Sequence, residues 1–199
     1  MDRAEELKVL HEKWLEKCDC SLRITATQGV PGDGNPNAQV VFIGEAPGKQ
    51  EDLGGRPFVG AAGKFLNEML ESIKMKREDI YITNIVKYRP PNNRDPLPDE
   101  IAACAKWLEE EIDLIQPLLI VFLGRHAMNQ FFPAEKISSA HGKVIIANKF
   151  KKCHYFLPLY HPAAALYNGS LREVLKEDFK KIPLALKMIK EKNKCEPPI

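Results

Sequence analysis

A loop rich in glycine, proline and acidic residues carries the side chains of this sequence that are best suited to chemistry. Glycine lets the backbone approach a ligand closely, and proline fixes the shape of a loop. A carboxylate can position or activate a water molecule, and an aromatic side chain can offer a flat face to a ring. These residue types predict a pocket for a small heterocycle, built from Gly44-Glu45-Ala46-Pro47-Gly48, Glu51-Asp52 and Arg56-Pro57-Phe58-Val59-Gly60.

Asn84 and His161 are two further polar residues, and each follows an apolar segment that is typical of a strand. An asparagine presents a donor and an acceptor, which suits the amide-like edge of a pyrimidine; a turn cap is the alternative. A histidine in this position is either a neutral donor in a site or a packed structural residue. Glu45 and Glu51 either handle a water molecule or serve as helix-start acids and surface charge.

Segments typical of strands and of helices alternate along the chain. The last helix is expected to break or kink at Pro183, and the last two strands are consistent with a hairpin around Asn148-Lys149. Such alternation predicts an α/β domain with a largely parallel sheet. The pattern gives strands at 39–43, 79–83, 118–123, 142–147 and 155–160, and helices at 2–17, 61–75, 98–115 and 170–182.

The ends of these strands place the polar residues together. In sheets of this kind, ligands bind outside the carboxyl ends of the strands. The predicted strands end at Gly44-Glu45, at Asn84, at Gly124-Arg125-His126 and at His161-Pro162. We therefore expect one crevice to collect Glu45, Asn84 and His161, with the Phe58 loop folded over it.

The overall composition is that of one globular domain. The chain has 199 residues, of which 44% are hydrophobic and 28% charged, and we expect a domain over 1–190 with a flexible tail at 191–199. No apolar run approaches the ~20 residues that span a bilayer. The charged N-terminus lacks a signal core, so we expect a cytoplasmic protein that does not enter a membrane. Five cysteines, an odd number, argue against a disulfide framework.

The net charge of +2 neither requires nor excludes a nucleic acid partner. Basic residues do gather at Lys87, Arg89 and Arg94. From charge alone, the simplest reading of this group is a solvated face.

Several motifs together resemble the family 4 uracil-DNA glycosylases of bacteria and archaea. The similarity runs from about Cys18 to Ile182, and the pattern GEAPG-x2-ED-x3-RPFVG is highly specific. The motifs that carry it are Gly44–Gly48, Glu51-Asp52, Gly55–Gly60, Thr83-Asn84, Lys87, Arg89–Pro91 and His161-Pro162.

The resemblance implies a three-layer α/β/α sandwich with a central, largely parallel four-stranded sheet. It implies a monofunctional DNA glycosylase that flips uracil out of single- or double-stranded DNA and hydrolyses the N-glycosidic bond. The product is an abasic site, as in base-excision repair of deaminated cytosine. No cofactor is required for this chemistry, and the resemblance is consistent with a monomer that associates with the nucleoid.

The resemblance also assigns roles within the pocket. Phe58 would stack on uracil, Asn84 would bind its polar edge, and His161 would donate to O2 as the base leaves. Glu45 and Glu51 would hold or activate the attacking water, and the sequence leaves open which of them matters more.

Some positions of the first motif depart from the best-known uracil glycosylases. Those enzymes carry an aspartate where this chain has Ala46, and a bulky ring that rejects the thymine methyl where it has Gly48. Gly44 and Ala46 are therefore expected to contact the substrate through their backbone atoms and to leave room for it. Catalysis is expected to depend more on Glu45 and on stabilisation of the leaving group.

DNA contacts outside the pocket are expected from three residues. Arg89 and Arg94, in the proline-rich loop, are candidates for phosphate contacts. Leu166 is a candidate wedge that fills the gap left in the base stack, and a packed leucine at the start of a turn is its alternative.

Most family 4 members hold an iron–sulfur cluster through four cysteines, and this chain does not reproduce that set. Cys20 and Cys104 match two of the positions, while Lys17 and Tyr88 stand at the other two. A four-iron cluster needs four soft ligands, so we expect none here. If one is retained, its ligands would be Cys18, Cys20 and Cys104.

Three alternatives remain for the function. One is a protein that binds uracil or abasic DNA without turnover. Another is a relative that bonds covalently to the abasic sugar through a histidine, but its basic insertion is absent and only His141-Gly142 stands nearby. The third is a nucleotide-binding α/β hydrolase, which the lack of a Walker-type loop and of GxGxxG disfavours.

Overall fold

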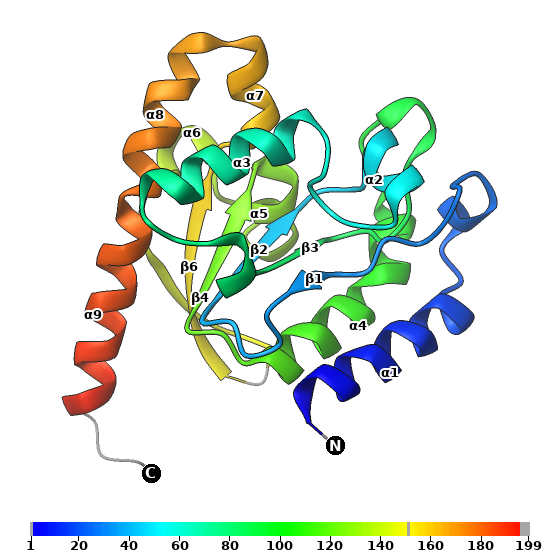
Figure 1. Cartoon of the computed structure of the whole chain (residues 1–199), viewed down its shortest axis with the longest axis horizontal. Coiled ribbons are helices and arrows are strands. Elements are labelled where there is room, and N and C mark those ends of the chain that lie inside the picture. Colours follow the sequence, from blue (N-terminus) through cyan, green and yellow to red (C-terminus); the bar gives the residue numbers. More distant parts are fainter. Residues whose placement is uncertain (1, 151, 196–199) are drawn as a thin grey trace.

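The computed structural model describes residues 2–150 and 152–195, and a six-stranded sheet runs through its centre (Figure 1). The strand order is β1-β3-β2-β4-β6-β5. The four central strands are parallel to one another, and β1 and β5 pair antiparallel at the two edges. The strands are β1 Asp33–Gly34, β2 Val40–Gly44, β3 Tyr81–Asn84, β4 Leu119–Leu123, β5 Ile145–Lys149 and β6 Lys152–Leu159.

Helices cover both faces of the sheet, because successive side chains of each central strand point to opposite faces. Phe42 and Val121 pack against α3, α8 and α9, whereas Val41 and Ile120 pack against α1, α4 and α5. The expected three-layer α/β/α architecture is thus confirmed. The helices are α1 Arg3–Lys17, α2 Lys49–Gly54, α3 Ala61–Ser72, α4 Pro98–Ile115, α5 Arg125–Phe131, α6 Ile137–Ala140, α7 Pro162–Tyr167, α8 Gly169–Phe179 and α9 Lys181–Cys195.

The expected four-stranded parallel sheet forms the centre, and two edge strands extend it. β1 is only two residues long and lies in a segment rich in glycine, proline and asparagine, so its pairing with β3 has no periodic signal in the sequence. β5 and β6 form the anticipated hairpin, but its turn follows Lys149 instead of being centred on Asn148-Lys149. Among the described residues, no helix combines the length and the hydrophobicity needed to cross a bilayer.

The C-terminal helices differ from the sequence expectation in where they break. α8 ends at Phe179 and α9 begins at Lys181, so the break precedes Pro183. Pro183 lies in the first turn of α9, where a missing N–H removes no helical hydrogen bond. α9 continues to Cys195, past the expected domain boundary at 190, and the rest of the expected tail, 196–199, lies outside the described residues.

A buried polar network supports the end of β3. Lys87 and Glu111 are fully buried and form an ion pair, and Thr83 donates to the same Glu111 oxygen at 2.9 Å. Lys87 also donates to Thr83 Oγ1 at 2.6 Å. The reading of Lys87 as part of a solvated basic face is therefore wrong. Its charge stabilises the strand that ends at Asn84.

Replacing Glu111 with glutamine is expected to lower the free energy of unfolding by about 3–5 kcal/mol, because it leaves the Lys87 charge buried and unpaired. Burial alone would raise the pKa of Glu111, but Lys87 and His11 hold it at about 2. The pair therefore stabilises the fold fully above the carboxyl's unfolded pKa of ~4.3, and this contribution is lost as pH falls toward 2.

Urea unfolding at neutral and acidic pH measures this effect. The neighbouring Glu110→Gln is the matched control, since Glu110 forms only partly exposed ion pairs with Lys13 and Lys106, which contribute about 0–1 kcal/mol. Equal stability of the two variants would contradict a stabilising role for the buried pair.

Candidate active site

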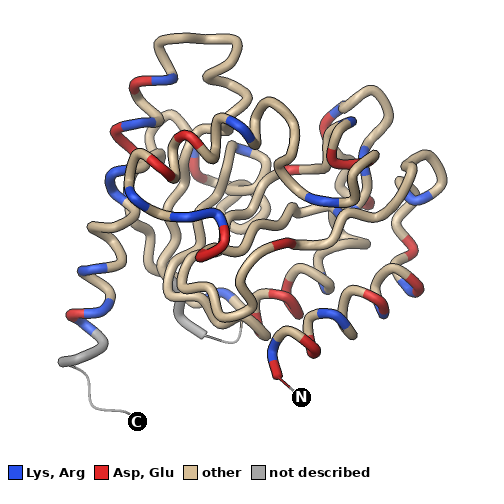
Figure 2. The backbone as a smooth tube through the Cα atoms, viewed as in Figure 1, with Lys and Arg blue, Asp and Glu red and all other residues tan. Residues whose placement is uncertain are grey.

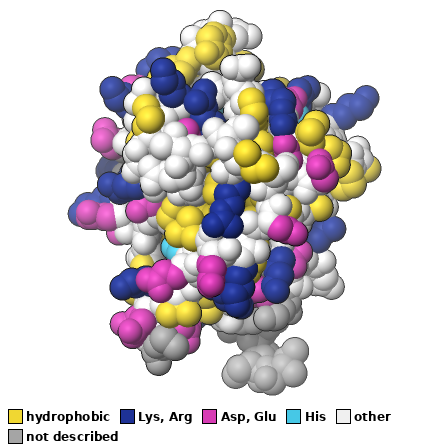
Figure 3. All heavy atoms as spheres, turned by 90° about the vertical axis from the view of Figure 1, so that its right-hand side faces the viewer, with side chains coloured by type: hydrophobic (Ala, Val, Ile, Leu, Met, Phe, Trp, Pro, Cys, Tyr) yellow, Lys and Arg dark blue, Asp and Glu magenta, His cyan; other side chains and the backbone are white. Residues whose placement is uncertain are grey.

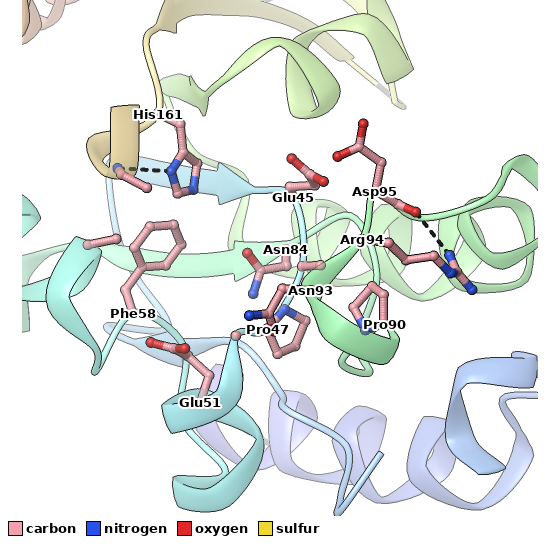
Figure 4. A pocket seen from close by; sticks show the side chains of 14 residues that line it. Glu45, Pro47, Glu51, Phe58, Asn84, Pro90, Asn93, Arg94, Asp95 and His161 are labelled. Atoms are coloured by element: carbon pink, nitrogen blue, oxygen red, sulfur yellow. Dashed lines mark hydrogen bonds between the residues drawn. The ribbon is translucent and has the colours of Figure 1, made fainter. Parts of the chain in front are cut away.

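A cavity of about 340 Å³ opens at the carboxyl ends of the central strands (Figure 4). Figure 4 shows side chains from β3, α2 and the loops after β2 and β6 turned toward this space. Glu45, Asn84 and His161 thus share one cavity, at the edge of the sheet that the predicted strand ends indicated. The cavity lining includes Glu45, Ala46, Gly48, Glu51, Phe58, Asn84, Arg94 and His161.

Gly44 ends β2 beside Asn84 on the neighbouring strand, and it is not among the residues that line the cavity. A Cβ atom at Gly44 would lie 2.5 Å from Asn84 Oδ1 and 2.7 Å from the Phe58 ring. Only glycine therefore leaves room for the amide and the aromatic ring at this position.

The Asn84 side chain is 3% exposed, and its Oδ1 atom has no hydrogen-bond partner among the described residues. Leaving a buried acceptor unpaired costs about 1–3 kcal/mol, and folded proteins keep few such groups. The unpaired oxygen lies beside the Phe58 ring at the floor of the cavity. This arrangement points to a ligand that brings an N–H group to Oδ1.

Phe58 is held in an unusual backbone conformation at one wall of the cavity. Its φ is +52°, in the left-handed region that bulky residues rarely occupy. Arg77 holds the loop by donating to Phe58 O at 3.1 Å and to Pro57 O at 2.6 Å. A Cβ at Gly63 would lie 1.8 Å from Phe58 O, so glycine is required there too. The ring centroids of Phe58 and His161 are 5.7 Å apart.

The two acids of the loop have different surroundings. Glu51 Oε1 accepts from the N–H groups of Val59 and Gly60 at 2.9 and 2.7 Å, so Glu51 fixes the loop that carries Phe58. Glu45 is partly buried, and burial raises its pKa while His126 opposes the rise. Both carboxylates line the cavity, and Glu51 has one of its two oxygens engaged in holding the loop.

His161 presents a neutral ring to the cavity. Its Nδ1 accepts from Ala163 N at 3.1 Å and so caps α7. Because Nδ1 accepts this bond, the proton of the neutral imidazole is on Nε2. Removal of the ring from water lowers the pKa of His161 to about 4, against a rise caused by Glu51. At neutral pH, His161 is therefore an uncharged hydrogen-bond donor.

Asp95 and His126 lie beside Glu45, and neither was expected there from the sequence. His126 Nε2 lies 3.1 Å from Asp95 Oδ2 and 4.0 Å from Glu45 Oε2. The sequence placed His126 at a strand end but did not include it among the residues expected in the crevice. Asp95 lies in the proline-rich loop before α4. This loop has no periodic sequence pattern from which the location of Asp95 in the fold could be predicted.

Arg94 lines the cavity, but its charge is already paired. Its two terminal nitrogens bind both oxygens of Glu100, one of them at 2.8 Å. Glu100 also accepts from Leu97 N at 2.7 Å and so caps the start of α4. The structure thus gives Arg94 a role in holding its own loop, which weakens its assignment as a phosphate contact.

The other expected DNA contacts lie outside the cavity lining. Arg89 is partly buried and donates to Asn93 Oδ1 at 2.8 Å. Leu166 is 44% exposed on α7. His141 bonds Asp178 at 2.6 Å and is also outside the lining.

Charge alone does not mark a DNA-binding face. Figure 2 shows the positions of basic and acidic residues interleaved along α1, α8 and α9. On the face in Figure 3, Lys and Arg side chains stand among hydrophobic and acidic ones and form no continuous basic surface. This distribution agrees with the net charge of +2.

Three free, buried cysteines gather behind the cavity, in the same apolar cluster as Tyr88. A hydrogen bond with Cys104 lowers the pKa of Cys18 to about 6 and also lowers that of Cys20. The Tyr88 ring is 2% exposed and packs edge-on against Trp14, with centroids 5.7 Å apart.

This donor set does not fit a cluster held by four thiolates. Tyr88 supplies a buried hydroxyl, which has no hydrogen-bond partner in the described part of the chain. The thiols of Cys18 and Cys20 donate to backbone carbonyls at 3.7 and 3.6 Å. The site therefore has three thiol groups that are engaged with protein atoms.

Comparison with known proteins agrees with this geometry. The family model described as "Uracil DNA glycosylase superfamily" matches residues 31–186. The Type-4 uracil-DNA glycosylase of Sulfurisphaera tokodaii is 47% identical over 188 residues, covering 92% of this chain and 84% of that protein. The Type-4 enzyme of Archaeoglobus fulgidus is 51% identical over 168 residues, covering 82% and 84%. A Type-5 enzyme from Thermus thermophilus is 35% identical over 157 residues, covering 71% and 68%. This chain belongs to the uracil DNA glycosylase superfamily.

Proposed function

We propose that this protein is a monofunctional uracil-DNA glycosylase that hydrolyses the N-glycosidic bond of a flipped uracil in DNA. The unpaired Oδ1 of Asn84 carries the proposal. Uracil offers an N3–H donor for that oxygen and an O4 acceptor for the Asn84 amide nitrogen. Phe58 supplies a face for the ring.

His161 would stabilise the departing base. As the bond to the sugar breaks, negative charge develops on uracil O2, and the neutral Nε2–H of His161 donates to it. A preorganised donor of this kind contributes about 3–4 kcal/mol to lowering the barrier. Glu45 would take a proton from the water that attacks the sugar carbon, while Glu51 holds the Phe58 loop.

Incubation with a uracil-containing oligonucleotide, followed by alkali, tests the function. Strand cleavage at the uracil, with many turnovers per protein molecule, is the expected result. A matched oligonucleotide with cytosine should remain intact. Intact uracil strands would reject the function, a single turnover would favour a binding protein, and a stable adduct on a denaturing gel would indicate covalent capture.

The way in which the protein grips DNA is also a proposal. Leu166 and the neighbouring Tyr167, which is 92% exposed, lie at the end of the helix that begins after His161. Leu166 would fill the space that the flipped base leaves, and Arg89 would contact a phosphate. Acting as a monomer in the cytoplasm, the protein would then accept uracil in single strands and in duplexes.

The cysteine site would work without an iron–sulfur cluster, because Tyr88 fills one of the ligand positions with a packed ring. We expect protein produced with ample iron and sulfide under anaerobic conditions to be colourless and active. Metal and sulfide analysis measures this, and stoichiometric iron in a brown protein would overturn it.

Tyr88→Phe gives a second measurement at this site. Removing a buried hydroxyl that has no partner relieves a cost of about 1–3 kcal/mol, so the variant should be at least as stable as the parent. Tyr81→Phe is the matched control, because the Tyr81 hydroxyl bonds Glu111 at 3.2 Å and its loss should destabilise the fold. A loss of stability in Tyr88→Phe would show that the hydroxyl has a partner.

A further inference from the structure

Glu45 faces two groups that come from other elements of the fold. Asp95 lies in the loop before α4, and His126 lies in the first turn of α5. The carboxylate oxygens of Glu45 and Asp95 and the imidazole nitrogen of His126 all lie within 4.8 Å of one another. Three segments far apart in sequence thus bring proton-binding groups to one edge of the cavity.

The Nε2 atom of His126 has a partner in either protonation state. Asp95 Oδ2, at 3.1 Å, can accept a hydrogen bond from it, and Arg125 Nε donates to it at 3.0 Å. A ring nitrogen that has both an acceptor and a donor within reach keeps a hydrogen bond when it gains or loses a proton. His126 is therefore equipped to take a proton and give it up again.

We propose that His126 and Asp95 are positioning residues that reset Glu45 after each turnover. The idea rests on the proposed glycosylase function. When the water oxygen bonds to the sugar carbon, the bond from that carbon to uracil N1 breaks and uracil keeps the electron pair. The proton lost by the water goes to Glu45. Because Glu45 Oε2 and His126 Nε2 are 4.0 Å apart, the proton then passes between them through one bridging water molecule. Asp95 holds the new N–H, and the partly exposed ring releases the proton to solvent.

The charges around Glu45 give this relay a measurable signature. His126 and Arg125 lower the pKa of Glu45, whereas burial and Asp95 raise it. Removing His126 and removing Asp95 should therefore shift the titration of Glu45 in opposite directions. His126 also lowers the pKa of His161, alongside burial, while Asp95 is not among the groups that shift it. Of the two changes, the one at Asp95 reports on Glu45 more directly.

The test compares His126→Gln and Asp95→Asn with the full-length wild type. Multiple-turnover excision of uracil from a single-stranded oligonucleotide is measured from acidic to neutral pH, beside the single-turnover rate. His126→Gln should lower the multiple-turnover kcat about tenfold with little change in KM, and the acidic limb of its pH–rate profile should move to higher pH. In Asp95→Asn the acidic limb should move to lower pH.

Asp99→Asn is the matched control, because it removes the same charge from an exposed position four residues away. It should leave the profile unchanged. If the acidic limbs of the pH–rate profiles of His126→Gln and Asp95→Asn stay in place, or move in the same direction, the relay is overturned. If His126→Gln fails to fold, Asp95→Asn decides the matter alone, since the Asp95 side chain is 62% exposed. An inactive wild type would instead reject the glycosylase function.

Discussion

Replacing His161 with alanine is expected to slow uracil excision by about 10²–10³-fold, the loss measured when one donor to a developing oxyanion is removed. The physical reason is that the Nε2–H group is held in place by the cap bond from Ala163 N to Nδ1, so it needs no reorganisation in the transition state. Because the effect belongs to the transition state, kcat should fall while affinity for uracil-containing DNA changes little.

Single-turnover kinetics and DNA titration measure the two quantities separately. His141→Ala is a suitable control, since His141 bonds Asp178 outside the cavity lining and should keep the wild-type rate. A wild-type rate in His161→Ala would remove His161 from the mechanism.

The pH dependence of the wild type gives a second test of His161. Burial lowers its pKa to about 4, so the ring stays neutral through the range in which a free histidine, with a pKa near 6.5, gains a proton. Loss of activity from protonation of His161 should therefore begin only as pH approaches 4. In stability terms, a depressed histidine pKa favours the fold above about pH 6.5, and that contribution declines as pH falls toward 4. If protonation of His161 already lowered the activity near neutral pH, the role of His161 as a neutral donor would be contradicted.

Replacing Asn84 with alanine is expected to lower kcat/KM for uracil by about 10²-fold, through loss of the hydrogen bonds to the base at a cost of about 1–3 kcal/mol. Asn84→Asp should be at least as damaging, because a carboxylate cannot donate to uracil O4. The free protein should lose little stability in Asn84→Ala, since Oδ1 has no partner among the described residues.

This pairing of effects distinguishes a binding role from a structural one. Competition by free uracil measures binding of the base, excision kinetics measure kcat/KM, and thermal unfolding measures the stability of the free protein. Asn37→Ala, at an exposed asparagine, provides the control. A large loss of stability together with unchanged inhibition by uracil would show that Asn84 is a structural cap and not a base reader.

Much of the architecture was predictable because its signals are local. The apolar run 118–123 identified β4, a strand buried on both faces. The apolar spacing of Leu7, Leu10 and Trp14 predicted the buried side of α1, and all three are buried. Element ends shifted by one to three residues, as at the break before Pro183. The local pattern allows a proline either before a helix or in its first turn. The packing of α8 and α9 determines that Pro183 lies in the first turn of α9.

Residue order alone determined that Glu45, Asn84 and His161 share an edge. Each follows a strand, and parallel strands bring their carboxyl ends to the same side of a sheet whatever the details of packing. The glycines that admit Phe58 and the cysteine set with Tyr88 were likewise visible in the sequence.

Only the tertiary structure decided which charged groups meet. Lys87 was grouped with surface cations, yet it is buried against Glu111. Arg94 is paired with Glu100, and Glu51 accepts from the loop it supports. Asp95 and His126 reach Glu45 from separate elements. A charge acts through its burial and its nearest partner, and both depend on contacts between distant segments that no local pattern records.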